Sequence, residues 1–178
     1  VVMEPKKQNK SWGILSAVGP STPVRRMGIN FGAPGDRKDG AGKEWFSYPR
    51  PASRGRLEYV FDLKPDVNAG GGWYSRNAES VSVAGDDEPW LFTSGGRGLK
   101  KFEIPMLGKD DAARSYRVRL YFANVDDKDT GPFDVKLQGQ VVASAVNIPT
   151  ANAGPVKPTI KEFEGVQVTD NLLVELVA

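Results

Sequence analysis

Two segments of this chain alternate regularly between apolar and polar side chains. In Tyr116–Ala123, Arg117 and Arg119 interrupt a run of apolar residues at every second position, and Phe133–Gln138 repeats the alternation with other polar residues. A period of two places successive side chains on opposite faces of an extended strand. The pattern therefore predicts two half-buried β-strands.

A third segment, Arg56–Leu63, has the same period and places apolar side chains on one face: Leu57, Tyr59, Phe61 and Leu63. The C-terminal Leu172–Val177 is apolar on both faces apart from Glu175, which is typical of a strand in the centre of a sheet. Shorter strand candidates are Ser80–Val83, Leu99–Met106, Gln140–Val142 and Lys161–Phe163.

Glycine and proline separate these segments. The 20 glycines and 13 prolines gather in clusters that are typical of turns: Gly32–Gly35, Gly70–Gly72, Gly95–Gly98 and Gly154–Pro155. Many short strands, with little helical periodicity, predict an all-β antiparallel sandwich or barrel. Two connections, Asp36–Pro51 and Ala69–Ala78, are longer than usual, and long loops on a rigid sandwich often carry function.

Length and composition fit one globular domain. The chain has 178 residues, of which 39% are hydrophobic, and this is enough for one core. We expect residues 1–27 to form an extension or linker, with one edge strand at most, and residues 28–178 to form the domain. Val1–Lys10 is polar and contains no signal peptide, so the chain looks like a fragment of a larger polypeptide.

Charge and residue usage exclude several classes of function. The net charge is +2, from 24 basic and 22 acidic residues without a basic block, which disfavours a nucleic-acid surface. No apolar run reaches the length of about 18 residues that a membrane-spanning helix needs, so we expect no membrane insertion. Cysteine and histidine are absent, which excludes disulfides, zinc sites of the usual composition and a Ser-His-Asp relay.

Aromatic residues in the two long connections are the strongest binding candidates. The first connection carries Trp45 and Tyr48, and the second carries Trp73 and Tyr74. Flat rings stack on the C–H faces of sugars while neighbouring polar groups bond the hydroxyls. For the first pair, an equally good interpretation is that the rings close one end of the sandwich. For the second pair exposure is favoured, because three glycines precede it and no strand alternation hides the rings.

Polar residues near these rings extend the candidate site. Arg76 and Asn77 follow the second aromatic pair, and the acidic run Asp126–Asp129 lies between the two alternating strands. This run offers oxygen ligands for a structural Ca²⁺, but it lacks the spacing of a calcium loop. A solvated hairpin tip is the alternative interpretation. Trp90–Phe92 is expected in the core, with Arg97 as an outlying polar candidate.

The sequence shows no converging groups of an active site. Glu44, Asp126 and Asp127 are possible glycosidase carboxylates, but the sequence places no two of them across a bond. We therefore expect a protein that is not an enzyme and that needs no cofactor.

The segment Tyr116–Ile148 resembles the malectin domain, a jelly-roll β-sandwich of the galactose-binding-domain-like type. The features that carry the resemblance occur in the family's order: Gly28–Gly32, Phe102–Pro105, Tyr121–Ala123, Phe133–Val135, Gly139–Val142 and Asn147-Ile148. A narrower resemblance is to malectin-like domains of exported planctomycete-type bacterial proteins, which have segments similar to Asn30–Asp36, Glu44–Pro49 and Lys161–Val166. It implies an extracytoplasmic accessory domain of a larger protein.

In malectin, loop tyrosines, an aromatic pair and a later aspartate bind glucose disaccharides. Here Val125 and Asp126 stand at the place of the aromatic pair and Gly154–Thr159 contains no acid, so diglucose specificity is not expected. Our first hypothesis is a non-catalytic carbohydrate-binding module for a glycan or polysaccharide. Its expected ligand-binding residues are Trp45, Tyr48, Trp73, Tyr74, Arg76, Asn77 and Asp126. The alternative is a structural or protein–protein module that docks a neighbouring domain.

Overall fold

The computed structural model describes residues 23–50, 63–85 and 88–178, and within these ranges the chain is nearly all β-structure. One antiparallel sheet contains five strands in the order β4-β5-β10-β7-β8. Their bounds are β4 Asp66–Ser75, β5 Ser94–Pro105, β10 Asn171–Val177, β7 Phe133–Leu137 and β8 Gln140–Val146. An antiparallel pair, β6 (Arg114–Phe122) with β9 (Thr159–Val168), forms a second sheet.

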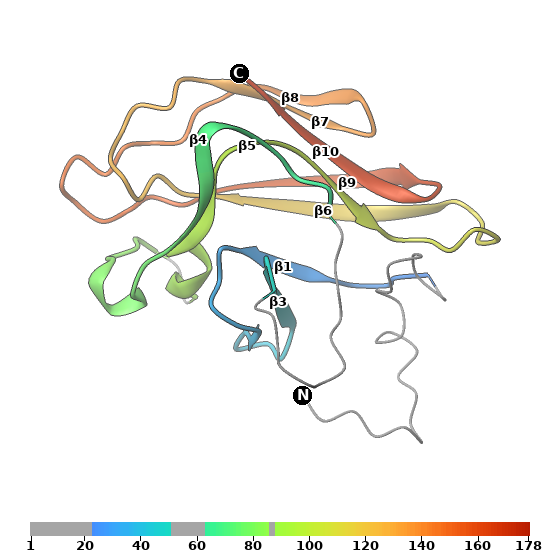
Figure 1. The fold of residues 1–178 in the computed structure, drawn as a ribbon, viewed down its shortest axis with the longest axis horizontal. Helices are drawn as coiled ribbons and strands as arrows, with labels where there is room; N and C mark the ends of the chain where they lie inside the picture. Colours follow the sequence, from blue (N-terminus) through green and yellow to red (C-terminus); the bar gives the residue numbers. More distant parts are fainter. Residues whose placement is uncertain (1–22, 51–62, 86–87) are drawn as a thin grey trace.

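A small third sheet has the order β1-β3-β2, with β1 at Gly28–Phe31, β2 at Arg37–Lys38 and β3 at Glu44–Tyr48. Figure 1 shows β1 in blue and β3 in teal, to one side of the long strands that cross the molecule. Two short 3-10 helices, η1 (Ala78–Ser80) and η2 (Pro89–Phe92), lie between β4 and β5 in the described sequence. The predicted all-β sandwich is confirmed.

The core lies between the five-stranded sheet and the β6–β9 pair. Strands of both sheets contribute its fully or nearly buried side chains: Phe102, Val118, Leu137, Val168, Leu172 and Val174. Each strand supplies every second residue to this layer, because successive side chains of a strand point to opposite faces. Val24, which precedes the predicted domain start at Gly28, is also 4% exposed and belongs to the core cluster.

The two alternating segments form strands, as predicted. In β6, Val118 is buried, whereas Arg117 and Arg119 point outward and pair with glutamates of β9. In β7, Val135 and Leu137 are 0% and 2% exposed. The two strands do not pair with each other, because β6 pairs with β9 while β7 lies between β10 and β8. The chain between them is therefore a crossover between two sheets and not a hairpin.

The C-terminal strand β10 is central, as its two apolar faces predict, with β5 on one side and β7 on the other. The predicted strands Leu99–Met106, Gln140–Val142 and Lys161–Phe163 fall within or overlap β5, β8 and β9. The strand predicted at Ser80–Val83 is wrong: Ser80 ends η1, and Val83 makes a single bridge to Val156. Most of the predicted strand Arg56–Leu63 lies outside the described residues.

Both long connections contain strands, so their prediction as loops is wrong. β3 lies in the first connection and pairs in parallel with β1, an interaction between segments that are far apart in sequence. β4 spans most of the second connection and reaches β5 through register shifts around Gly70–Gly72. Gly70 has a φ of +81°, and glycine adopts this backbone conformation without steric cost. A glycine run that resembles a loop is here an irregular strand.

No helix in the described part of the chain is long and apolar enough to cross a membrane.

Candidate functional site

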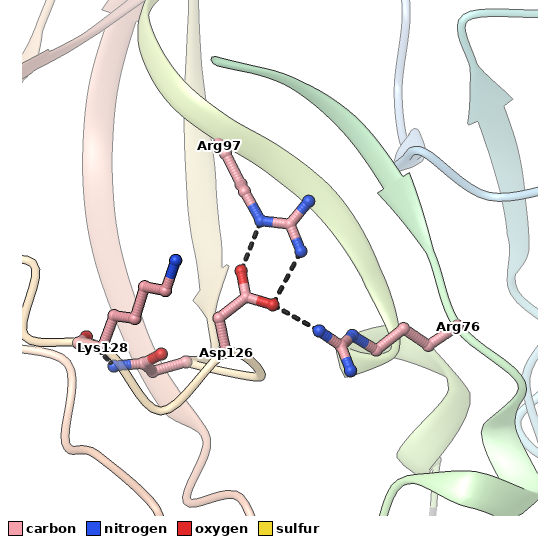
Figure 2. Close-up of polar contacts among 5 residues, drawn as sticks. Arg76, Arg97, Asp126 and Lys128 are labelled. Atoms are coloured by element: carbon pink, nitrogen blue, oxygen red, sulfur yellow. Dashed lines mark hydrogen bonds and ion pairs between the residues drawn. The ribbon is translucent and has the colours of Figure 1, made fainter. Parts of the chain in front are cut away.

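Three side chains gather around the carboxylate of a fourth residue. Tyr74 lies in β4 and Arg76 directly follows this strand, Arg97 lies in β5, and Asp126 lies on the crossover between β6 and β7. Arg97 donates from Nε to Asp126 Oδ2 and from Nη2 to Oδ1 at 2.7 Å, and Arg76 donates from Nη2 to Oδ1. Figure 2 shows both guanidinium groups directed at this carboxylate. We call these four residues the Asp126 cluster.

The register of β4 and β5 explains why the cluster forms. Tyr74 pairs with Gly95 and Gly72 pairs with Arg97. Because side chains alternate along a strand, Tyr74 and Arg97 share a face. Gly95 leaves room for the phenol ring, since a Cβ there would lie 2.8 Å from Tyr74 Oη. The Arg97 guanidinium carbon is 4.3 Å from the centre of that ring, a favourable cation–π contact.

Hydrogen bonds and burial shift the pKa values of three residues in the cluster. The bonds from Arg97 and then Arg76 lower the pKa of Asp126, although partial burial acts in the opposite direction. The same contact raises the pKa of Arg97. Burial raises the pKa of Tyr74, and the positive charge of Arg97 opposes this increase. At neutral pH the cluster therefore contains one carboxylate, two guanidinium ions and a neutral phenol.

The crossover that carries Asp126 is held by its own polar contacts. Asn124, which is 6% exposed, donates from Nδ2 to the Lys128 carbonyl at 2.5 Å. The carboxylate of Asp127 accepts from the backbone N–H groups of Asn152 at 2.7 Å and Ala153 at 3.0 Å. Asp126 and Asp127 thus bind different partners. Among the residues that the structure describes, no three acidic side chains lie close enough together to hold a metal ion.

The expected binding residue Asn77 has a structural contact. Its side-chain oxygen accepts from the backbone N–H of Glu79 at 3.0 Å and caps η1. This bond fixes the turn that follows Arg76. It also explains why the segment after Asn77 leaves the sheet instead of continuing as a strand.

Trp73 and Tyr48 lie in a different place from Tyr74. Trp73 stacks on Phe31, with ring centres 5.4 Å apart and planes at 7°, and Tyr48 meets both rings edge-on. All three rings are half-buried. Trp73 and Tyr74 are consecutive in β4 and so point to opposite faces. The structure therefore separates the two aromatic residues that the sequence places side by side.

Trp45 is only 5% exposed, so the expectation that its ring is available to a sugar is wrong. Its Nε1 donates to Asp39 at 3.1 Å, and its ring packs edge-on against Trp90 and Tyr121. A large aromatic ring in a strand is stabilised most by packing against other rings. The alternative interpretation, a ring that helps to close the sandwich, describes this residue. Trp90 and Phe92 are buried as predicted.

A cavity of about 790 Å³ lies between the sheets, lined by residues of β1, β5, β6 and β10. Several of its lining residues, including Phe102, Val118 and Val174, are core side chains. Arg26, Lys43 and Arg119 also line it. Burial, and then the charge of Arg26, lower the pKa of Lys43, although Asp39 opposes them. This mainly apolar space suits sugar hydroxyls less well than the Asp126 cluster does, because buried hydroxyls need hydrogen-bond partners.

The structure brings together three of the seven expected residues: Tyr74, Arg76 and Asp126. It adds Arg97, which the sequence suggested only as an outlying polar candidate. Its position relative to Tyr74 depends on the register between β4 and β5, which a single sequence does not show.

No protein-family model matches the sequence, and no curated protein matches it. Among solved structures, a β-glucuronidase of Bacteroides uniformis is similar to this chain, with a TM-score of 0.59 and 12% identity. Two structures of β-glucuronidase 2 from that organism, a calcium-binding mutant and a covalent complex with cyclophellitol-6-carboxylate aziridine, have TM-scores of 0.58 and 11% identity. Each alignment covers 85% of this chain and 16% of the enzyme chain. At this identity the likeness shows a shared fold alone: a β-sandwich that forms a small part of much longer carbohydrate-active enzymes.

Proposed function

We propose that this chain is a non-catalytic, malectin-like carbohydrate-binding module that binds a glycan or polysaccharide at the Asp126 cluster. The observation that carries the proposal is the convergence of Tyr74, Arg76 and Arg97 on Asp126 from separate elements. The arginine side chains are 44% and 43% exposed and Asp126 is 23% exposed. The cluster therefore offers oriented N–H groups to a ligand at the surface.

The geometry of the cluster favours binding over turnover. Glycoside hydrolysis uses two carboxyl groups placed across the scissile bond, one of them protonated as the acid. Asp126 is one carboxylate, and its arginine partners lower its pKa, which is the wrong direction for a general acid. We therefore propose that the module holds its ligand without breaking a bond.

The fold comparison supports an accessory role. The similar segments make up 16% of long β-glucuronidase chains, so in those proteins a sandwich of this fold is a small part of a larger enzyme. We propose that this module is likewise part of a larger, extracytoplasmic protein. In that setting it would keep the parent protein close to its glycan.

Isothermal titration calorimetry with a panel of soluble glycans tests the proposal. We expect at least one glycan to bind, and Arg97→Gln to weaken that binding, because the substitution removes the charge and the fork of donors. Arg117→Gln is the matched control, since Arg117 is also an exposed arginine but pairs with Glu164 on the β6–β9 sheet. No heat of binding across the panel, or equal affinities of the wild type and Arg97→Gln, would contradict the proposal.

A second candidate function is docking of a neighbouring domain, and strand β8 favours it. β8 is the edge of the five-stranded sheet, has no charged residue, and exposes Val141 and Val142 at 52% and 37%. Uncharged, apolar edge strands pair readily with other chains. If β8 docks a domain, its backbone amides will exchange hydrogen more slowly in the parent protein than in the isolated chain. Equal exchange rates would exclude this surface.

A further inference from the structure

We infer that the Asp126 cluster recognises an anionic group on the glycan, a uronic acid carboxylate or a sulfate ester, in preference to neutral hydroxyls. The inference rests on the proposed function and names the class of its ligand. Three observations support it: the acceptors of the cluster are largely occupied, its donors are largely unoccupied, and its net charge is positive.

The acceptors of the cluster are largely occupied. Asp126 Oδ1 accepts from both arginines, and Oδ2 accepts from Arg97 Nε. A carboxylate accepts about four hydrogen bonds, so one acceptor position remains. A neutral sugar hydroxyl is best held where it can both donate and accept. Asp126 has little capacity left for that role and serves instead to hold the two arginines.

The donors are largely unoccupied. Each guanidinium carries about five N–H donors. Within the described residues, the side chain of Arg76 bonds only through Nη2, and that of Arg97 only through Nε and Nη2. The surface that a ligand meets is therefore made of donors, and a group that only accepts fits it best. Carboxylates and sulfates are such groups, and arginine is well suited to bind them.

Charge points in the same direction. Two guanidinium ions face one carboxylate, which leaves the cluster with a net positive charge. Lys128 is on the same crossover, makes no ion pair among the described residues, and extends its side chain on the side where Arg97 lies (Figure 2). The other two acids of this crossover accept hydrogen bonds from backbone amides. Asp127 accepts from Asn152 and Ala153, and Asp129 accepts from Gly131.

The arginines are also held in place before a ligand arrives. Arg97 lies over the Tyr74 ring and is bonded twice to Asp126. A side chain that is already ordered loses less conformational entropy on binding. The ordered arginines are therefore expected to bind an anion more tightly than mobile surface residues of the same charge.

Matched polymers test the inference. Polygalacturonate is compared with its fully methyl-esterified form, and dextran sulfate with dextran, by isothermal titration calorimetry with the folded chain. We expect each anionic form to bind at least about tenfold more tightly than its neutral match, the range for charge-assisted hydrogen bonds. The binding constant for the anionic form is also expected to fall as salt rises. Binding of only one anionic polymer would identify carboxylate or sulfate as the group recognised.

Variants separate this site from general attraction. Arg76→Gln and Arg97→Gln should each weaken binding of the anionic polymer by about tenfold or more. Arg97→Lys should recover part of the loss, because it keeps the charge but not the fork. Arg117→Gln should stay within about twofold, as for an exposed ion pair. Thermal unfolding of each variant shows whether it is folded at the temperature of the titration.

Four outcomes overturn the inference. Equal affinity for the anionic and the neutral form in both polymer pairs shows that charge is not recognised. An equal loss in Arg117→Gln and Arg97→Gln shows attraction to the whole surface. Binding of neutral glycans alone, weakened by Arg97→Gln, overturns the inference while the proposed function stands, whereas absence of binding to every polymer overturns both.

Discussion

Gly32 marks the closest approach of the small sheet to the large one. Its φ is +69°, and a Cβ at this position would lie 2.2 Å from the Tyr74 carbonyl oxygen and 2.8 Å from that of Gly95. Both contacts are with backbone atoms, which cannot rotate away as a flexible side chain can. The glycine therefore lets β1 turn directly beside the strand pair that holds Tyr74 and Arg97.

Gly32→Ala is expected to lower the free energy of unfolding by more than about 2 kcal/mol, because it adds both a left-handed strain and a backbone clash. Gly35→Ala is the control. Gly35 has no atom within 4 Å of its Cβ position, so its substitution should change stability by no more than about 0.5 kcal/mol. Urea denaturation of both variants measures the difference. Equal effects would contradict the close backbone approach at Gly32.

Asp126 links the cluster to pH. Its pKa in the folded chain is below the unfolded value of about 3.9. A carboxyl whose pKa is lowered on folding stabilises the folded state fully above the unfolded pKa, and this contribution is lost as the pH falls through the folded pKa.

Asp126→Asn should therefore lower stability at pH 7 by about 0.5–1 kcal/mol, a small value because the ion pairs are partly exposed to water. The difference from the wild type should shrink as the pH falls from about 4 toward 2. Thermal unfolding across this range measures it, with Asp110→Asn in the turn before β6 as the control. A difference that is constant with pH would show that the charge of Asp126 is not the cause.

At the scale of elements, β10 connects most of the core. It pairs with β5 and β7, and Leu172 and Val174 are 5% and 1% exposed. The same strand carries Val177 near its end, with 42% of its surface exposed. One strand thus offers a buried and an exposed apolar position in the same backbone environment.

Leu172→Ala is expected to cost about 2–5 kcal/mol, from lost burial and the cavity that remains. Val177→Ala should cost less than about 1 kcal/mol, since little buried surface is lost. Guanidinium denaturation compares the two. Similar losses at both positions would mean that the buried side of β10 does not form the core contact described.

The β6–β9 pair shows why its arginines are the poorer candidates for a ligand. Arg117 contacts Glu162 at 3.5 Å and Glu164 at 2.7 Å, and Arg119 also pairs with Glu162. Opposite charges alternate across the outer face of these two strands. Arg117 and Arg119 therefore pair with two glutamates of the chain itself. The two arginines of the Asp126 cluster pair with a single carboxylate.

At the scale of the whole molecule, the tryptophans of the described residues belong to two separate aromatic groups. Trp45 packs with Trp90 and Tyr121, while Trp73 packs with Phe31 and Tyr48. Trp45 and Trp90 are buried and Trp73 is half-buried. The two groups should therefore respond differently to a quencher in solution.

Trp73→Phe is expected to remove more of the acrylamide-quenchable fluorescence than Trp45→Phe, because quenching follows exposure of the indole ring. Stern–Volmer plots of the two variants and the wild type measure this. A larger effect from Trp45→Phe would contradict the assignment of Trp45 to the interior.

Local pattern was sufficient for the strands whose two faces differ. β6 and β7 alternate because one face of each meets the core, and β10 lies in the middle of its sheet, paired with β5 and β7. The cluster was only partly predictable. Tyr74, Arg76 and Asp126 stood out by residue type, but their grouping depends on contacts between residues that are far apart in sequence.

The sequence by itself determined the class of fold and most of the long strands, because the buried positions of a strand recur at every second residue and are apolar. Tertiary structure decided the rest. The parallel pairing of β1 with β3 is one such relation. The irregular register of β4 on β5 placed Arg97 over Tyr74, and the crossover after β6 placed Asp126 between two arginines. These contacts depend on which strands pair with each other, and strand pairing depends on how the whole chain packs.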